Sequence, residues 1–126
     1  MHSSMKRYLV ARLKSFRPAF EGLWIMLKEE PNARIHLLAL ITVVVLGILL
    51  NISKAEWITV ALASGLVIGI EAINSAIENL SDFVSPQYHI RIKKVKDLSA
   101  AAVLVSALAA LATGLIIYIP KLLDLC

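Results

Sequence analysis

The chain has 126 residues, of which 59% are hydrophobic, and its mean hydropathy is +0.78. An ordinary soluble domain is about 45–50% apolar, so this composition excludes a typical water-soluble fold and favours a bilayer as the solvent. Thirteen basic residues exceed nine acidic ones, but they lie between apolar runs, where basic residues orient membrane helices. Nucleic acid is therefore not an expected partner. The length allows one domain, residues 1–126.

Basic and apolar positions alternate at helical spacing through the first thirty or so residues. This pattern predicts an amphipathic interfacial helix over residues 5–30. Pro18 is expected to kink or divide that helix, because a proline inside a helix lacks the N–H group and crowds the preceding turn. The alternative interpretation is a solvated basic tail.

Three apolar runs follow, at residues 35–52, 55–80 and 98–119. The first is near the lower length limit for crossing the hydrocarbon, and the second reaches bilayer length only if its helix includes Glu71, Asn74 and Glu78. The third is rich in Ala, Ser and Gly, which let helices approach closely in lipid, and Pro120 is expected to end it. The sequence thus predicts an all-α membrane protein with an interfacial helix and three transmembrane helices, and so thin a bundle favours an oligomer.

Basic residues are distributed unevenly around these runs. Seven precede the first run, four lie between the second and third, and one lies in each remaining segment. Because cytoplasmic loops carry the excess of Lys and Arg, the N-terminus and the second loop are expected in the cytoplasm and the C-terminus outside.

Four polar residues form a stripe on the second predicted span. At about 100° per residue, Glu71, Asn74, Glu78 and Asp82 share one helix face over roughly 16 Å. A carboxylate at membrane depth costs several kcal/mol unless it is paired, metal-bound, protonated or hydrated, so such residues are candidates for function. The alternative is that the stripe pairs with neighbouring helices and only holds an oligomer together.

Acidic residues of two other segments are expected at the cytoplasmic level of this stripe: Lys96-Asp97 at the start of the third span, and Glu29-Glu30 at the end of the interfacial helix. Carboxylates are hard oxygen ligands suited to Mg²⁺, which usually binds one or two of them together with substrate phosphates. The alternative role for Asp97 is a negative charge in the first turn of a helix, and the alternative role for Lys96 is an interface anchor.

Other site chemistry is not indicated. His36 and His89 are too isolated for zinc, and a structural role is expected for both. Neither a phosphate loop nor a protein-kinase signature is present. The pattern alone predicts a metal–carboxylate site that faces the cytoplasm, and it does not select a reaction.

Several segments resemble the prokaryotic diacylglycerol kinase and undecaprenol kinase family of small integral-membrane lipid kinases. The resemblance is carried by the segments 71–82, 85–89 and 96–103, and also by 16–23, 30–36 and 114–120. It implies a homotrimer in a bacterial plasma membrane that transfers the γ-phosphoryl group of ATP, with Mg²⁺, to a lipid hydroxyl at the cytoplasmic interface. The Ile35-His36 segment is more similar to the Gram-positive branch of the family, the undecaprenol kinases, so undecaprenol is the expected acceptor. Diacylglycerol is the alternative acceptor.

The resemblance also implies roles for individual residues. Glu71 is expected to be the general base, Glu30 and Glu78 to hold the metal and nucleotide, and Asn74 to support them. Lys96 and Asp97 are expected to position the phosphate and the base. Basic residues of the interfacial helix are candidates for contacts to phosphates or headgroups, or for interfacial anchors: Arg12, Lys14 and Arg17.

Two questions stay open at this point. Pro31 departs from the usual family residue after Glu30, so either Glu29 or Glu30 could be the metal ligand. Acidic stripes in membrane helices also mark ion pathways, so an ion-coupled transporter subunit and a purely structural scaffold are the alternatives to a kinase.

Overall fold

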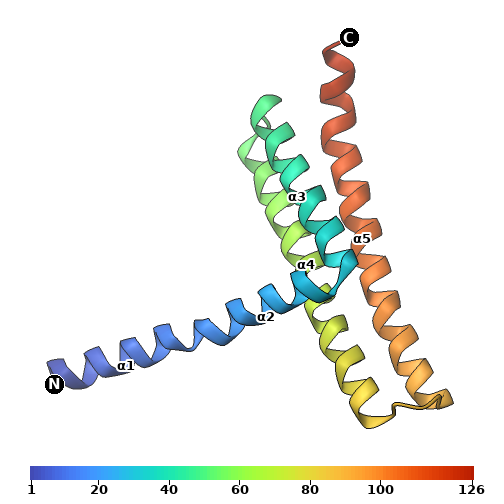
Figure 1. The fold of residues 1–126 in the computed structure, drawn as a ribbon. Coiled ribbons are helices and arrows are strands. Elements are labelled where there is room, and N and C mark those ends of the chain that lie inside the picture. Colours follow the sequence, from blue (N-terminus) through green and yellow to red (C-terminus); the bar gives the residue numbers. More distant parts are fainter.

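The computed structural model describes all 126 residues as five α-helices joined by short turns (Figure 1). The helices are α1 (His2–Lys14), α2 (Phe16–Glu29), α3 (Pro31–Leu49), α4 (Lys54–Val84) and α5 (Ile90–Asp124). By length and composition, α3, α4 and α5 are each able to cross a membrane. The predicted all-α fold with an N-terminal helical segment and three long apolar helices is therefore confirmed.

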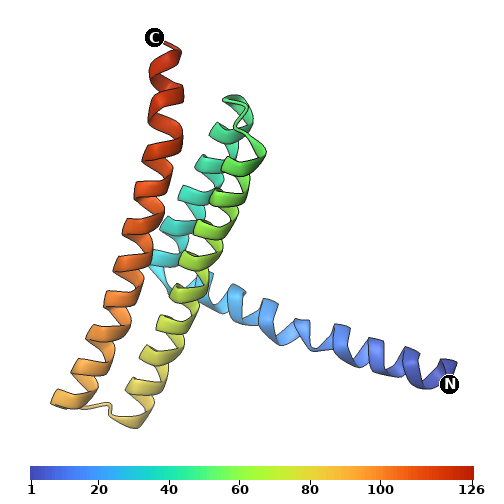
Figure 2. The ribbon, with the colours of Figure 1, turned by 180° about the vertical axis from the view of Figure 1, so that it is seen from behind.

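The three apolar helices stand side by side, and α1 and α2 project from them as an arm that ends at the N-terminus (Figures 1 and 2). The arm joins the bundle at a corner between α2 and α3, partway along α4. Beyond this corner, α4 and α5 continue as a two-helix hairpin closed by residues 85–89. If the arm lies on the membrane surface, this hairpin extends into the aqueous phase.

The predicted N-terminal helix is divided, and the break lies at Ser15. Pro18 occupies the first turn of α2, where its missing N–H would have no helical partner in any case. A continuous helix would instead need a bond from residue 18 to the carbonyl of Lys14, the last residue of α1. The Ser15 hydroxyl donates to the Arg12 carbonyl over 2.6 Å at the break.

Pro31 creates the corner between α2 and α3. The residue before a proline is disfavoured in helical conformation, and Glu30 has extended backbone angles, φ −106° and ψ 110°. Pro31 itself begins α3, the position where proline is best tolerated. Arg34 then reaches back to the end of α2, where its Nε donates to the Leu27 carbonyl over 2.8 Å and its Nη2 donates to the Lys28 carbonyl.

The turn between α3 and α4 has strong local signals. Asn51 adopts a positive φ of 53°, which asparagine tolerates better than most residues. Ser53 and Glu56 form a capping box at the start of α4, with bonds of 3.2 Å and 2.9 Å. Helix α3 thus ends at Leu49, short of the predicted limit at residue 52.

Helix α5 is longer at both ends than the third predicted run. His89 caps its N-terminus, since its Nδ1 accepts from the Arg91 N–H over 3.1 Å. The basic segment that was expected to precede a helix at residue 98 is therefore already helical. The prediction that Pro120 ends the helix is wrong, because α5 continues to Asp124. Pro120 removes one backbone hydrogen bond, and this loss disturbs only the last turns of the helix because Pro120 lies near its end.

A small core ties the ends of α3, α4 and α5 together. Ile52, Val60, Ile117 and Tyr118 are buried there, and the Tyr118 hydroxyl donates to the Val43 carbonyl over 2.7 Å. A Cβ on Gly47 would lie 2.7 Å from Cη2 of Trp57 and 3.0 Å from the Tyr118 hydroxyl. Glycine is thus required at position 47 for the helices to approach.

We expect Gly47→Ala to destabilise the protein by about 1–3 kcal/mol, the usual cost of an overpacked contact, because Trp57 and Tyr118 must move. The matched control is Gly65→Ala, where a Cβ meets nothing within 4 Å and the better helix propensity of alanine should stabilise by up to about 1 kcal/mol. Thermal unfolding in detergent measures both. Equal shifts in the two variants would contradict the close contact at Gly47.

Candidate active site

The acidic stripe on α4 changes steadily in burial along the helix. Glu71 is 1% exposed and Asn74 is 8% exposed, Glu78 is half-buried, and Asp82 is exposed. The buried end, Glu71, lies beside His36 of α3, and the exposed end, Asp82, pairs with Lys96 of α5 on the hairpin. The stripe therefore runs from the interior of the three-helix bundle to the exposed surface of the hairpin.

Glu71 is the most buried large side chain of the protein. Its Oε2 lies 3.7 Å from Nε2 of His36 on α3, which is too long for a hydrogen bond. This oxygen is the one buried side-chain polar atom without a hydrogen-bond partner. An unsatisfied buried acceptor is costly, so Glu71 Oε2 is the atom of the stripe that is free to accept a hydrogen bond from another molecule.

Glu30 reaches α4 from the corner. The Ser75 hydroxyl donates to Oε1 of Glu30 over 3.1 Å, and Ser75 lies one turn from both Glu71 and Glu78 on α4. Glu29, in contrast, is exposed at the end of α2. Of the two glutamates, Glu30 is therefore the one that faces the stripe, and the turn at Pro31 directs it there.

Asn74 is held by α5. The Ser99 hydroxyl donates to Oδ1 of Asn74 over 2.7 Å, and both side chains are buried. Because the carbonyl oxygen of the amide is engaged in this way, its two N–H donors point elsewhere. The bond fixes the orientation of the amide beside Glu71 and Glu78.

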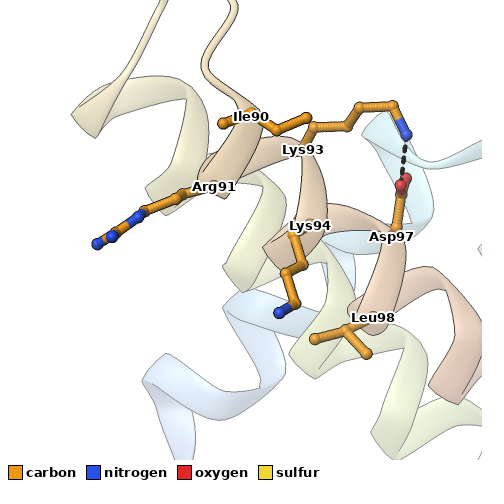
Figure 3. Close-up of a pocket in the computed structure, with 6 residues that line it drawn as sticks. All are labelled: Ile90, Arg91, Lys93, Lys94, Asp97 and Leu98. Atoms are coloured by element: carbon orange, nitrogen blue, oxygen red, sulfur yellow. Dashed lines mark hydrogen bonds and ion pairs between the residues drawn. The ribbon is translucent and has the colours of Figure 1, made fainter.

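Lys96 and Asp97 lie on the hairpin, and each is engaged in an ion pair. Lys96 Nζ lies 2.5 Å from Oδ1 of Asp82, which links α5 to the exposed end of the stripe. Asp97 lies 2.5 Å from Nζ of Lys93, one turn earlier on α5. Figure 3 shows the Lys93 and Asp97 side chains pointing toward each other, with Arg91 directed away from them. Lys96 therefore joins the stripe, and Asp97 does not contact it.

Lys14 and Arg17 are the predicted site residues that the fold keeps apart from the stripe. Both lie at the break between α1 and α2, far along the arm (Figure 1). Arg17 pairs with Glu21 on the surface, with Nε 3.1 Å from Oε1. Neither residue can serve the stripe of its own chain in this arrangement.

Glu30 bonds to Ser75, which lies one turn from Glu71 and from Glu78, so three carboxylates lie near the corner. They form no group of three or more His, Cys, Asp or Glu close enough to hold a metal by themselves. Protein sites for Mg²⁺ nevertheless usually supply one or two carboxylates, and the phosphates of the substrate complete the coordination. The donor chemistry of Glu30 and Glu78 thus fits Mg²⁺ brought in with a nucleotide.

Three contact residues were not identified from the sequence as part of the site: His36, Ser75 and Ser99. The signal for Ser75 was present, because it lies four residues after Glu71 on the same helix face. Ser99 was interpreted only as a small residue for close helix packing, and His36 only as structural. Their partners lie on other helices, so helical periodicity carries no information about them.

We expect Ser99→Ala to destabilise the protein by about 1–3 kcal/mol, because the buried Asn74 carbonyl loses its donor. Ser106→Ala is the control, since the buried Ser106 hydroxyl bonds only to the Val103 carbonyl of its own helix and its loss should cost less. Denaturation of both variants in one detergent is the measurement. A loss with Ser106→Ala as large as that with Ser99→Ala would contradict a special role of the interhelical bond.

Comparison with known proteins identifies the family. Residues 17–118 match the family model described as "Prokaryotic diacylglycerol kinase". The "Undecaprenol kinase" of Bacillus subtilis is 36% identical over 109 residues, which cover 86% of this chain and 89% of that protein. The "Diacylglycerol kinase" of Synechocystis is 36% identical over 114 residues, or 90% of this chain and 65% of that protein. A Helicobacter pylori "Diacylglycerol kinase" is 32% identical over 104 residues, which cover 75% of this chain and 79% of that protein.

These matches include the corner, the acidic stripe and the hairpin, and they decide between the kinase, transporter and scaffold hypotheses. The chain belongs to the prokaryotic diacylglycerol kinase family and is a membrane-embedded lipid kinase that uses ATP as its phosphate donor.

Proposed function

We propose that the protein transfers the γ-phosphoryl group of ATP to the hydroxyl of undecaprenol, which gives undecaprenyl phosphate. The observation that carries the reaction is the buried carboxylate of Glu71, with one oxygen unpartnered and the Glu30 carboxylate held one turn away through Ser75. A base at membrane depth and a second carboxylate toward the aqueous hairpin match the two substrates of a lipid kinase.

Glu71 is the proposed general base. Its free Oε2 accepts the proton of the lipid hydroxyl while the hydroxyl oxygen bonds to the γ-phosphorus and the bond to the β–γ bridging oxygen breaks, which releases ADP. A general base must lie within hydrogen-bond reach of the proton that it removes, and an acceptor that no protein group satisfies is available for that proton. His36, 3.7 Å away, limits the space in which the carboxylate can move.

Glu30 and Glu78 are the proposed ligands of Mg²⁺. When bound, the ion neutralises phosphate charge that would otherwise repel the carboxylates, and phosphoryl transfer depends mainly on positioning and charge stabilisation. Asn74, oriented by Ser99, offers its N–H donors to the carboxylates or phosphates of this cluster.

Lys96 and Asp97 are proposed to position phosphate near the hairpin. Nucleotide phosphate would compete with Asp82 for Lys96. Lys14 and Arg17 would reach phosphates only if the arm of another protomer brings them to the site, and their other proposed role is to anchor the arm to lipid headgroups.

Undecaprenol is preferred as the acceptor on two grounds. The match covers 89% of the relative named for undecaprenol, compared with 65% and 79% of the Synechocystis and Helicobacter pylori relatives named for diacylglycerol. The Ile35-His36 segment is also more similar to the undecaprenol kinase branch, and His36 lies directly against Glu71. Diacylglycerol remains the alternative acceptor.

The proposed assembly is a homotrimer in a bacterial plasma membrane, with the N-terminus and the α4–α5 hairpin in the cytoplasm and the C-terminus outside. The basic residues of the arm and of the start of α5 support this orientation. The fact that only 14 of the 126 residues are buried in the single chain supports further contacts between chains.

We expect the purified protein to transfer labelled γ-phosphate from MgATP to undecaprenol faster than to diacylglycerol in the same detergent. Glu71→Gln should reduce the transfer rate by about 10²–10⁴-fold, the usual contribution of a general base. Thin-layer separation of the labelled lipids measures both results.

The control for this assay is Glu56→Gln, on the same helix. Glutamine can keep the capping box with Ser53 and loses only the charge pair with Lys121, so activity should stay near that of the wild type. Faster transfer to diacylglycerol would refute the acceptor assignment, and an active Glu71→Gln variant would refute the assignment of the base.

Glu29 and Glu30 provide a second matched comparison. We expect Glu30→Gln to raise KM for MgATP by about tenfold or more, the equivalent of 1.4 kcal/mol, because a metal ligand is lost. Glu29→Gln removes the same charge one residue earlier from an exposed position and should leave KM nearly unchanged. Steady-state kinetics with varied MgATP make the measurement, and a larger effect of Glu29→Gln would show that the wrong glutamate was assigned.

A further inference from the structure

Pro31 deprives the end of α2 of one of its usual backbone donors. In a continuous helix, the Leu27 carbonyl would accept from the N–H group of residue 31, and proline has no N–H group. The Lys28 carbonyl would accept from residue 32, which already belongs to α3 beyond the corner. Both carbonyls are thus among the last of the helix, which have no partner inside it and are open to a donor from another part of the chain.

The Arg34 side chain supplies a donor to each of these carbonyls. Its Nε donates to the Leu27 carbonyl over 2.8 Å, and its Nη2 donates to the Lys28 carbonyl. The planar guanidinium holds its N–H groups in a fixed fork that suits two neighbouring acceptors, whereas a lysine ammonium lacks this geometry. A basic side chain at the C-terminal end of a helix also interacts favourably with the helix dipole. Arg34 thus takes the place of the backbone donors that the corner removes.

Arg34 holds the chain on both sides of Glu30. Its side chain bonds to the end of α2, and its backbone N–H donates to the Glu30 carbonyl over 3.4 Å. Between these bonds the Glu30 backbone is extended, and the Glu30 carboxylate accepts from the Ser75 hydroxyl of α4 over 3.1 Å. Glu30 lies at the corner between the arm and the bundle (Figure 1). The angle between α2 and α3 therefore decides whether its side chain reaches α4.

We propose that Arg34 is a positioning residue for Glu30: its bonds to the end of α2 fix the corner, so that the Glu30 carboxylate stays beside Ser75. This inference rests on the proposed function, in which Glu30 is a ligand of Mg²⁺, and it adds the residue that orients this ligand before the metal binds. Groups that orient a metal ligand typically contribute about 10–100-fold to metal affinity. Arg34 thus acts on the affinity for the metal and nucleotide through Glu30.

The test is Arg34→Lys, which keeps the positive charge and loses the fork. Electron paramagnetic resonance measures the dissociation constant of Mn²⁺, which suits the same oxygen ligands as Mg²⁺, on the full chain with a non-hydrolysable ATP analogue. We expect Arg34→Lys to raise this constant about tenfold. In the kinase assay, KM for MgATP should rise by a similar factor, while kcat and KM for the lipid stay within about twofold of the wild type.

A double variant shows whether Arg34 acts through Glu30. Glu30→Gln alone should weaken Mn²⁺ binding at least as much as Arg34→Lys, because a ligand is lost. Adding Arg34→Lys to Glu30→Gln should then change the constant less than about twofold, since residues of one network have non-additive effects. The control is Arg7→Lys, the same exchange at an exposed position of α1, which should keep the constant of the wild type.

The possible failures are distinguishable. An unchanged Mn²⁺ constant in Arg34→Lys, with a raised constant in Glu30→Gln, would refute the inference and leave Arg34 as a helix cap only. Further weakening in the double variant would also refute it, because Arg34 would then act independently of Glu30. Loss of helical circular dichroism or of the oligomeric mass in Arg34→Lys would assign Arg34 to folding and contradict a positioning role. An unchanged constant in Glu30→Gln would instead refute the proposed metal ligand itself.

Discussion

The burial of Glu71 is the constraint on which the site depends. A carboxylate within a membrane bundle is expensive, and here one of its oxygens has no partner at all. The fold keeps it in place with His36 on one side and with an α4–α5 contact, sealed by the Ser99–Asn74 bond, one turn away. In the proposed reaction, the lipid hydroxyl would supply the missing hydrogen-bond donor, so the free energy lost by burying Glu71 would be offset in the complex with substrate.

The corner at Glu30-Pro31 divides the structure into an apolar three-helix part and a charged part formed by the hairpin. Proline forces Glu30 out of helical conformation, which turns the arm away from the bundle and directs the Glu30 side chain to Ser75. The three apolar helices lie together on one side of this corner, and the charged hairpin lies on the other. A lipid kinase must combine a substrate from the bilayer with one from water, and the two parts suit these two sources.

The helices themselves followed from the sequence, because apolar runs long enough to span a bilayer have few alternatives to α-helix. One boundary also agreed closely, because α4 begins at Lys54, next to the start of the predicted run at residue 55. The start of α5 was placed too late and its end too early. By sequence pattern, the basic residues before residue 98 and Pro120 are the expected limits of the helix. The helix nevertheless begins at Ile90, because His89 caps it there, and cooperative helix formation extends it beyond Pro120 to Asp124.

The sequence by itself determined the membrane fold and the α4 stripe, since a 3.6-residue period alone places Glu71, Asn74 and Glu78 on one face. Tertiary structure decided what this face meets. That Glu30 and not Glu29 reaches it, that His36 and Ser99 contact it, and that Lys14 and Arg17 stay remote depend on the packing between helices. Helical periodicity shows which residues share a face of one helix. It does not show how the helices pack against one another, so contacts between helices become known only from the tertiary structure.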